Sequence, residues 1–182
     1  MMKLQTKNII IVGVGGQGIV FLTKLLAFVL HQQEYEVKVS EIHGMSQRKG
    51  SVVTNIRYGE KVFAPTIELG NADYMIALET IELLRFYPYL SSDGKIFWNK
   101  CVVDIEGEQK DYIGMVNKKR VVRSIDGKIE NANIVLYGII VKYLGISKHV
   151  SYEILKKAYT KKNYHEVLDL FEKAYDSMNE EE

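Results

Sequence analysis

The most restrictive feature of the chain is a glycine-rich turn set between a strand-like run and a helix-like run. Residues 8–14 read NIIIVGV, a continuous apolar stretch typical of a parallel strand buried on both faces. GVGGQG occupies positions 13–18, and residues 19–33 then have the length and apolar spacing of a helix. A second strand-like run, VKVSE, follows at 37–41. This order predicts a β-α-β unit, and with it a parallel sheet.

The same alternation continues along the chain and predicts an α/β fold. Further strand-like runs cover residues 52–59, 72–78 and 95–99, SSDG at 91–94 reads as a turn, and a helical run covers 80–90. Strands that alternate with helices form mostly parallel sheets with helices on both faces. We therefore expect an α/β fold with a mostly parallel, Rossmann-like sheet, flanking helices and a C-terminal helical segment.

The C-terminal half of the sequence has a different pattern. Residues 101–130 mix charges with short β-prone runs, and VVRSI at 121–125 suggests a small antiparallel addition. Three helical runs follow from Asn133 onward. Asn163, with Glu166 three residues later, fits a capping box at the start of the last run.

The length of the chain favours one domain. With 182 residues, it can bury a substantial core without splitting. We expect a single domain over residues 1–182, with an α/β core at 1–145, a helical extension at 146–178 and a frayed tail at 179–182.

Composition excludes several classes of site. A net charge of +1 gives no support for a nucleic-acid partner. The lone Cys101 excludes an internal disulfide, and also a cysteine-ligated zinc or iron–sulfur site built from this chain alone. The N-terminus lacks the layout of a signal peptide, and no apolar stretch is long enough to cross a bilayer. We expect a cytoplasmic protein with no membrane partner and no metal site.

The glycine-rich turn satisfies G-x-G-x-x-G through Gly13, Gly15 and Gly18. Glycine permits a tight turn, close backbone approach and close packing of helix on strand, and the helix start favours a phosphate or another anion. The same turn can also serve packing alone, so both interpretations stay open. Glu41, which ends the second strand-like run, stands where a dinucleotide site would need an acid. The candidate ligand-binding residues of the turn are Gly13, Gly15, Gly16, Gln17 and Gly18.

A second segment, SEIHGMSQRKGSV at 40–52, has the residues of a ligand-binding loop. Arg48 and Lys49 suit a phosphate or a carboxylate, although a solvated loop or a salt bridge to another subunit accounts for them equally. His43 is a weak catalytic candidate and can equally make a structural hydrogen bond. The candidate ligand-binding residues of this segment are Gly44, Met45, Ser46, Gln47, Arg48, Gly50 and Ser51.

Four stretches together resemble one protein family. GVGGQGIVFLTKLLA and VKVSEIHGMSQRKGSVVTNIRYG resemble the gamma-type domain of 2-oxoacid:ferredoxin oxidoreductases, most closely the beta subunit of the indolepyruvate type. ETIELLRFYPYLSSDGKIFWN and NANIVLYG resemble two further motifs of that family. The resemblance covers roughly residues 8–145. NKKRVVRSIDGKIENAN stands where the family has an alanine-rich segment, so indolepyruvate and other 2-oxo acids both remain candidate substrates.

The resemblance implies a place in the CoA-dependent oxidative decarboxylation of a 2-oxo acid, which uses thiamine diphosphate and iron–sulfur clusters. This chain has one cysteine and lacks the G-D-G…N-N pattern of thiamine diphosphate sites. We therefore expect a non-redox subunit with no catalytic residue of its own, inactive in isolation. The resemblance implies that a large partner subunit holds both cofactors and passes electrons to ferredoxin, while coenzyme A is a possible ligand of this chain.

Two other functions remain open from the sequence. One is a free-standing dinucleotide-binding oxidoreductase that uses the glycine turn and Glu41. The other is a structural interaction module in which the glycine turn holds no ligand.

Overall fold

The computed structural model of the protein describes residues 5–43, 50–100, 116–125, 131–159 and 164–179. The strands are β1 (Lys7–Val14), β2 (Glu36–His43), β3 (Ser51–Gly59), β4 (Ala72–Ala77), β5 (Leu90–Asn99) and β6 (Val121–Ile125). The α-helices are α1 (Ile19–His31), α2 (Thr80–Phe86), α4 (Ala132–Tyr143), α5 (Lys148–Ala158) and α6 (Tyr164–Asp176). A short 3-10 turn at Tyr87–Tyr89 follows α2.

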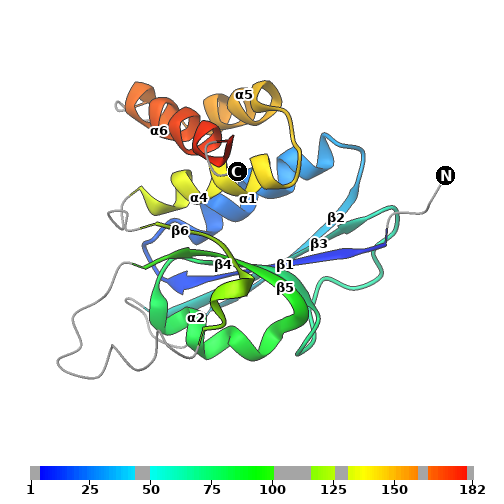
Figure 1. Cartoon of the computed structure of the whole chain (residues 1–182). Coiled ribbons are helices and arrows are strands. Elements are labelled where there is room, and N and C mark those ends of the chain that lie inside the picture. The colour runs from blue at the N-terminus through cyan, green and yellow to red at the C-terminus, as the bar shows by residue number, and fades with distance from the viewer. Residues whose placement is uncertain (1–4, 44–49, 101–115, 126–130, 160–163, 180–182) are drawn as a thin grey trace, which may run out of the picture.

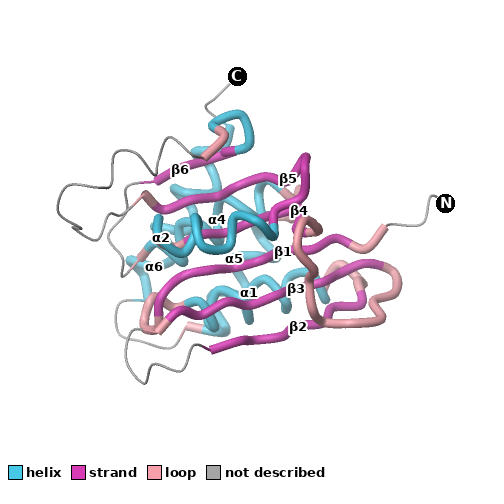
Figure 2. The backbone as a smooth tube through the Cα atoms, turned by 90° about the horizontal axis from the view of Figure 1, so that it is seen from below, coloured by secondary structure: helices cyan, strands magenta, loops and turns pink. Residues whose placement is uncertain are grey.

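The strands form one sheet of six in the order β2-β3-β1-β4-β5-β6, which Figure 2 shows from one face. Strands β1, β4, β5 and β6 pair in parallel, whereas β3 runs antiparallel to both β1 and β2. The prediction of a mostly parallel α/β sheet is therefore confirmed. The opening β-α-β unit is split, because β3 lies between its two strands.

Two local predictions need correction. Residues 121–125 form β6, which pairs in parallel with β5 rather than as an antiparallel addition. The strand predicted at 95–99 begins earlier, at Leu90, and SSDG lies inside it as an irregularity where the register with β4 shifts. The predicted cap residue Asn163, most of 101–130 and most of the predicted frayed tail lie outside the described residues.

Helices cover both faces of the sheet (Figure 1). On one face α1 and α4 lie against the strands, and α5 and α6 form an outer layer over them. On the other face lies α2, above a second apolar cluster. Ile9 and Ile11 belong to the first cluster and Ile10 and Val12 to the second, and all four are 0% exposed. Burial on both faces is the reason for the unbroken apolar run of β1.

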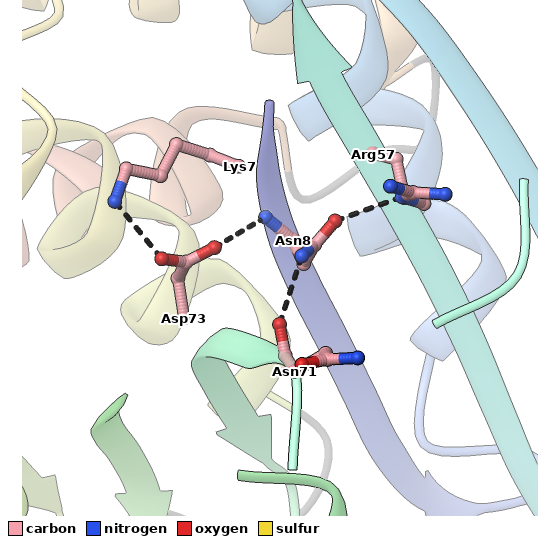
Figure 3. A network of polar contacts seen from close by, with 5 residues as sticks. All are labelled: Lys7, Asn8, Arg57, Asn71 and Asp73. Carbon is pink, nitrogen blue, oxygen red and sulfur yellow. Dashed lines mark hydrogen bonds and ion pairs between the residues drawn. The ribbon is translucent and has the colours of Figure 1, made fainter. Parts of the chain in front are cut away.

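A polar network fixes the edge of the sheet at which β1 and β4 begin (Figure 3). The Asp73 carboxylate accepts from the Lys7 ammonium and from the Asn8 amide, both at 2.9 Å. The Asn8 side chain donates to the Asn71 carbonyl at 2.8 Å and accepts from the Arg57 guanidinium at 2.8 Å. Arg57 also donates to the carbonyls of Ala64 and Thr66. These bonds tie the connection between β3 and β4 to the sheet.

Helices α4 and α6 approach each other closely at Gly138. A Cβ at this position would lie 2.9 Å from the Phe171 carbonyl oxygen and 3.1 Å from the Tyr175 amide nitrogen. Phe171 itself is 0% exposed and packs against the Tyr137 ring, with ring centroids 5.5 Å apart. The glycine thus lets the outer layer come down onto the helices that cover the sheet.

Candidate functional site

The candidate site lies at the carboxyl edge of the sheet, the edge at which its parallel strands end. In open α/β sheets, ligands bind outside this edge, where successive connections leave to opposite faces. Here α1 leaves β1 toward one face and α2 leaves β4 toward the other (Figure 1). Because β3 runs the opposite way, its first residue, Ser51, also lies at this edge beside Val14.

The glycine turn is held by bonds of its own. Gln17 is 8% exposed, and its side-chain oxygen accepts from the Val14 amide at 2.8 Å. The Gln17 amide donates to the Val14 carbonyl at 3.1 Å. The amide of Gly15 donates to the carbonyl of Gly50 at 2.9 Å. The turn is therefore closed on itself and fastened to the start of β3.

The glycines of the turn serve different purposes. A Cβ at Gly13 would lie 2.6 Å from the Gln17 side-chain oxygen and 3.1 Å from the Leu78 Cβ. At Gly18, which has φ +79°, a Cβ would lie 2.3 Å from the Asn133 amide nitrogen. Gly16 has φ +98° and no atom within 4 Å of its would-be Cβ. Close packing accounts for Gly13 and Gly18, whereas Gly16 is open.

The two candidate segments of the sequence meet in space. The second segment leaves β2 at His43, whose Cα partner is Val52, and returns at Gly50 beside the glycine turn. Its central residues, Gly44, Met45, Ser46, Gln47, Arg48 and Lys49, lie outside the described part of the chain. The Gly15–Gly50 hydrogen bond therefore joins two motifs that the sequence separates by more than a helix and a strand.

A buried carboxylate fastens the start of β3 to α2. Glu82 is 3% exposed; its carboxylate accepts from the Ser51 hydroxyl at 2.5 Å and pairs with the Arg85 guanidinium at 3.1 Å. A buried carboxylate is tolerated when it is paired and hydrogen-bonded in this way. Sequence analysis selected Ser51 for ligand binding and did not consider Glu82. The structure gives the Ser51 side chain a partner within the chain.

A second buried carboxylate begins the same helix. Glu79 is 4% exposed, and its side chain caps α2 by accepting from the Glu82 amide at 3.1 Å. Burial raises the pKa of Glu79, and the hydrogen bond from the Glu82 amide offsets only part of this shift. Sequence analysis missed this residue too, because a glutamate before a short helix resembles any helix start.

Glu41 does not have the position that a dinucleotide site requires. It lies within β2 opposite Thr54 of β3, and β2 continues to His43. Because β3 separates β2 from β1, Glu41 is two strand spacings, about 9.5 Å, from the strand that carries the glycine turn. In a dinucleotide-binding unit the acid comes from the strand next to the first. The split unit therefore argues against that function.

The described residues contain neither a metal-binding cluster nor a membrane-spanning helix. Across residues 5–43, 50–100, 116–125, 131–159 and 164–179, no group of three or more His, Cys, Asp or Glu side chains could hold a metal ion. No helix in the same ranges is both long and apolar enough to cross a membrane.

The chain is similar in sequence to proteins named indolepyruvate oxidoreductase subunit IorB. The chain is 45% identical over 92 residues to the indolepyruvate oxidoreductase subunit IorB of Thermococcus kodakarensis, covering 50% of this chain and 46% of that protein. The protein of the same name from Pyrococcus horikoshii is 44% identical over 92 residues, with the same coverage. The chain thus spans about half the length of the curated relatives that it matches.

Solved structures share the fold at low sequence identity. The gamma subunit of a keto/oxoacid ferredoxin oxidoreductase from Geobacter sulfurreducens superposes with a TM-score of 0.72 at 16% identity, covering 96% of this chain and 99% of that one. A 2-oxoglutarate:ferredoxin oxidoreductase from Magnetococcus marinus, with 2-oxoglutarate, coenzyme A and succinyl-CoA bound, has a TM-score of 0.72 at 17% identity. The superposition covers 99% of this chain and 31% of that longer protein.

The sequence profile of the pyruvate ferredoxin/flavodoxin oxidoreductases matches residues 8–177, which is nearly the whole chain. The resemblance drawn from the glycine turn, the 40–52 segment and the two later motifs is thereby confirmed. On this match, and on the relatives and the fold that agree with it, the chain belongs to the pyruvate ferredoxin/flavodoxin oxidoreductase family.

Proposed function

We propose that this chain is the non-redox small subunit of a 2-oxoacid:ferredoxin oxidoreductase, most similar to the indolepyruvate type. The observation that carries the proposal is the Gly15–Gly50 hydrogen bond, which brings both family motifs to the carboxyl edge of one sheet. The names of the relatives support the subunit role. The coenzyme A bound by the Magnetococcus protein supports a ligand that carries phosphate groups.

In the proposed complex the chemistry takes place on a large partner subunit. The bond from the 2-oxo carbon to the carboxylate breaks and releases CO2, the acyl carbon loses two electrons and forms a thioester with CoA, and ferredoxin accepts the electrons. Thiamine diphosphate would supply the electron sink for the carbanion, and iron–sulfur clusters would carry the electrons. Residues of this chain do not fit either group, because it has one cysteine and lacks the G-D-G…N-N pattern of thiamine diphosphate sites.

The role left for this chain is to present its carboxyl edge to the partner and to coenzyme A. The backbone amides of the glycine turn at Gly16 and Gly18 are suited to an anion, whereas the Gly15 amide already donates to the Gly50 carbonyl. Arg48 and Lys49 in the adjoining segment supply positive charge for a phosphate or a carboxylate. Ser51 and Glu82 hold the base of that segment against α2.

Co-purification from the native host tests the subunit role. The tagged full-length chain should carry a larger subunit with it, and the complex should contain thiamine diphosphate and iron. The complex, with CoA and ferredoxin, should oxidise a 2-oxo acid, while the chain alone should show no such activity. Comparing indolepyruvate with other 2-oxo acids then names the substrate.

Two results would contradict the proposal. One is turnover of a 2-oxo acid, or reduction of a nicotinamide, by the purified chain alone. The other is tight, saturable NADH binding followed by fluorescence, which would restore the dinucleotide function that the position of β3 argues against.

A further inference from the structure

Helices α1 and α5 border a groove at the surface of the protein, with a volume of about 470 Å³. Phe21, near the start of α1, packs edge-on against Tyr159, just after the end of α5, with ring centroids 6.0 Å apart. Gln32, just after α1, and His149, near the start of α5, both line the groove. The two helices, which lie one above the other in Figure 1, therefore run in opposite directions along it.

The floor of the groove is apolar and includes an exposed aromatic ring. Phe28 of α1 is 58% exposed. Val150, Ile154 and Ala158 follow one another at intervals of four residues on α5, so they line the groove from one face of that helix. Val150 and Ile154 are half-buried and also pack against the core cluster beneath α1. Covering the Phe28 ring with an apolar partner would remove this surface from water, which is favourable.

One end of the groove carries positive charge. Lys24 is exposed and lies one turn before Phe28 on α1, and Lys157 is exposed and lines the groove near the end of α5. Because the start of α1 lies beside the end of α5, both lysines flank the same end of the groove. Within the described part of the chain, neither lysine forms an ion pair. Glu153, an acid that lines the groove, pairs with Lys156 at 3.9 Å.

We propose that this groove binds an amphipathic helix of a partner protein, with apolar side chains on Phe28 and Ile154 and acidic side chains beside Lys24 and Lys157. A groove between two packed helices suits the ridge of a third helix. The lining of α5 from residue 149 to 158 is about 14 Å long, which corresponds to about two to three turns of the incoming helix. Complementary charge then selects an acidic helix.

A second copy of this chain does not supply a suitable helix. Its acid-rich helix is α6, whose apolar residues Val167, Leu168 and Phe171 are buried within its own protein. The large subunit of the proposed complex is the partner that we assign. That assignment rests on the proposed function, whereas the preference of the groove for an acidic amphipathic helix needs only this chain.

Two designed helical peptides test the groove on the full-length chain. Both have about 14 residues with leucines at i, i+4 and i+7, and the leucines are flanked by glutamates in one peptide and by lysines in the other. In fluorescence anisotropy, the glutamate peptide should bind saturably. It should bind at least about tenfold more tightly than the lysine peptide, because only its charges complement those of the groove.

Variants at exposed positions locate the binding. Phe28→Ala should weaken binding of the glutamate peptide at least about tenfold, because an aromatic ring at the centre of a contact contributes most to affinity. Phe63→Ala, which truncates a ring that is 82% exposed before β4, is the matched control and should bind as the wild type does. Lys157→Glu should remove the preference for the glutamate peptide. Its control is Lys119→Glu, which lies beside β6 at the far edge of the sheet.

The co-purified complex tests the assignment to the large subunit. Amide hydrogen exchange in residues 24–32 and 149–158 should be slower in the complex than in the free chain. The complex formed by F28A should lose this protection, and the complex formed by F63A should keep it.

Several results would overturn the proposal: no saturable binding of the glutamate peptide, undiminished binding by F28A, or equal affinity for both peptides. Dimerisation of the free chain that F28A abolishes would assign the groove to a second copy instead. Unchanged exchange in the complex would exclude the large subunit as the source of the helix. Failure of the peptides leaves co-purification with a large subunit unaffected, and failure of co-purification leaves the peptide test unaffected, so the two proposals fail separately.

Discussion

The contact between α4 and α6 gives a sharp test, because two effects of opposite sign meet at Gly138. Glycine within a helix is about 0.5–1 kcal/mol less favourable than alanine, so helix propensity alone predicts that Gly138→Ala stabilises the protein. The added methyl would, however, lie 2.9 Å from both the Phe171 carbonyl oxygen and the Ala174 Cβ. Helix α6 would have to move, because one of these neighbours is backbone.

We expect the steric effect to prevail. Overpacking a close contact typically destabilises by about 1–3 kcal/mol, which leaves a net loss of up to roughly 2.5 kcal/mol after the gain in helix propensity. For a chain of this size, each kcal/mol lowers the melting temperature by about 2–4 °C. Urea unfolding followed by circular dichroism would measure the difference directly.

A second variant separates overpacking from other causes. Ala174→Gly removes the methyl that faces Gly138 and leaves the Phe171 carbonyl in place. In the double variant, G138A should therefore be less harmful than in the wild-type background, with a coupling of at least about 0.5 kcal/mol. A G138A protein that is more stable than the wild type would refute the reasoning, because propensity would then outweigh the contact.

Three further predictions concern the polar contacts. Ser51→Ala removes the hydroxyl that donates to the buried Glu82 carboxylate, and should lower the free energy of unfolding, measured in urea, by about 1.5–3 kcal/mol. Ser51→Thr keeps a hydroxyl and should retain most of the wild-type stability. Equal stability of S51A and the wild type would contradict this prediction. Burial raises the pKa of Glu79 above its ordinary value of 4.5, so the stability that its protonated form contributes is present below pH 4.5 and is lost as the pH rises through the raised pKa. As the pH rises from 4.5 through the raised pKa, the stability of Glu79→Gln relative to the wild type should therefore increase. A difference in unfolding free energy that does not change with pH would contradict this prediction. Arg57→Met removes the hydrogen bonds to Asn8 and to the carbonyls of Ala64 and Thr66. It should speed amide hydrogen exchange in residues 60–71 and leave exchange in α5 unchanged. Exchange that is faster by the same factor in all elements would instead indicate global unfolding.

Local patterns in the sequence were enough for most elements but not for their order in the sheet. The apolar run of β1 and the spacing of α1 depend on neighbours in the chain, and both elements form as predicted. The place of β3 depends on which strand edges remain free, and no local pattern specifies it. The segment 121–125 was assigned the wrong direction for the same reason, because a short β-prone run carries no information about its partner.

The candidate site was predictable in part. The glycine turn was recognisable because close packing and φ > 0 demand glycine at fixed spacing. The bond from Ser51 to Glu82 spans 31 residues, and the approach of Asn133 to Gly18 spans a larger separation still. Such pairs arise only from the tertiary arrangement. NANIVLYG was recognised as a family motif, and the structure adds the direction in which Asn133 points its amide.

The place of β3 has a consequence for the order of assembly during synthesis. Among the strands that the structure describes, β1 pairs only with β3 and β4, and β2 pairs only with β3. When synthesis has proceeded only as far as β2, the strands β1 and β2 are therefore not hydrogen-bonded to each other, and α1 has no continuous sheet to pack against. Emergence of β3 from the ribosome supplies the missing middle strand to both at once, so this strand is where the first half of the protein becomes one cooperative unit.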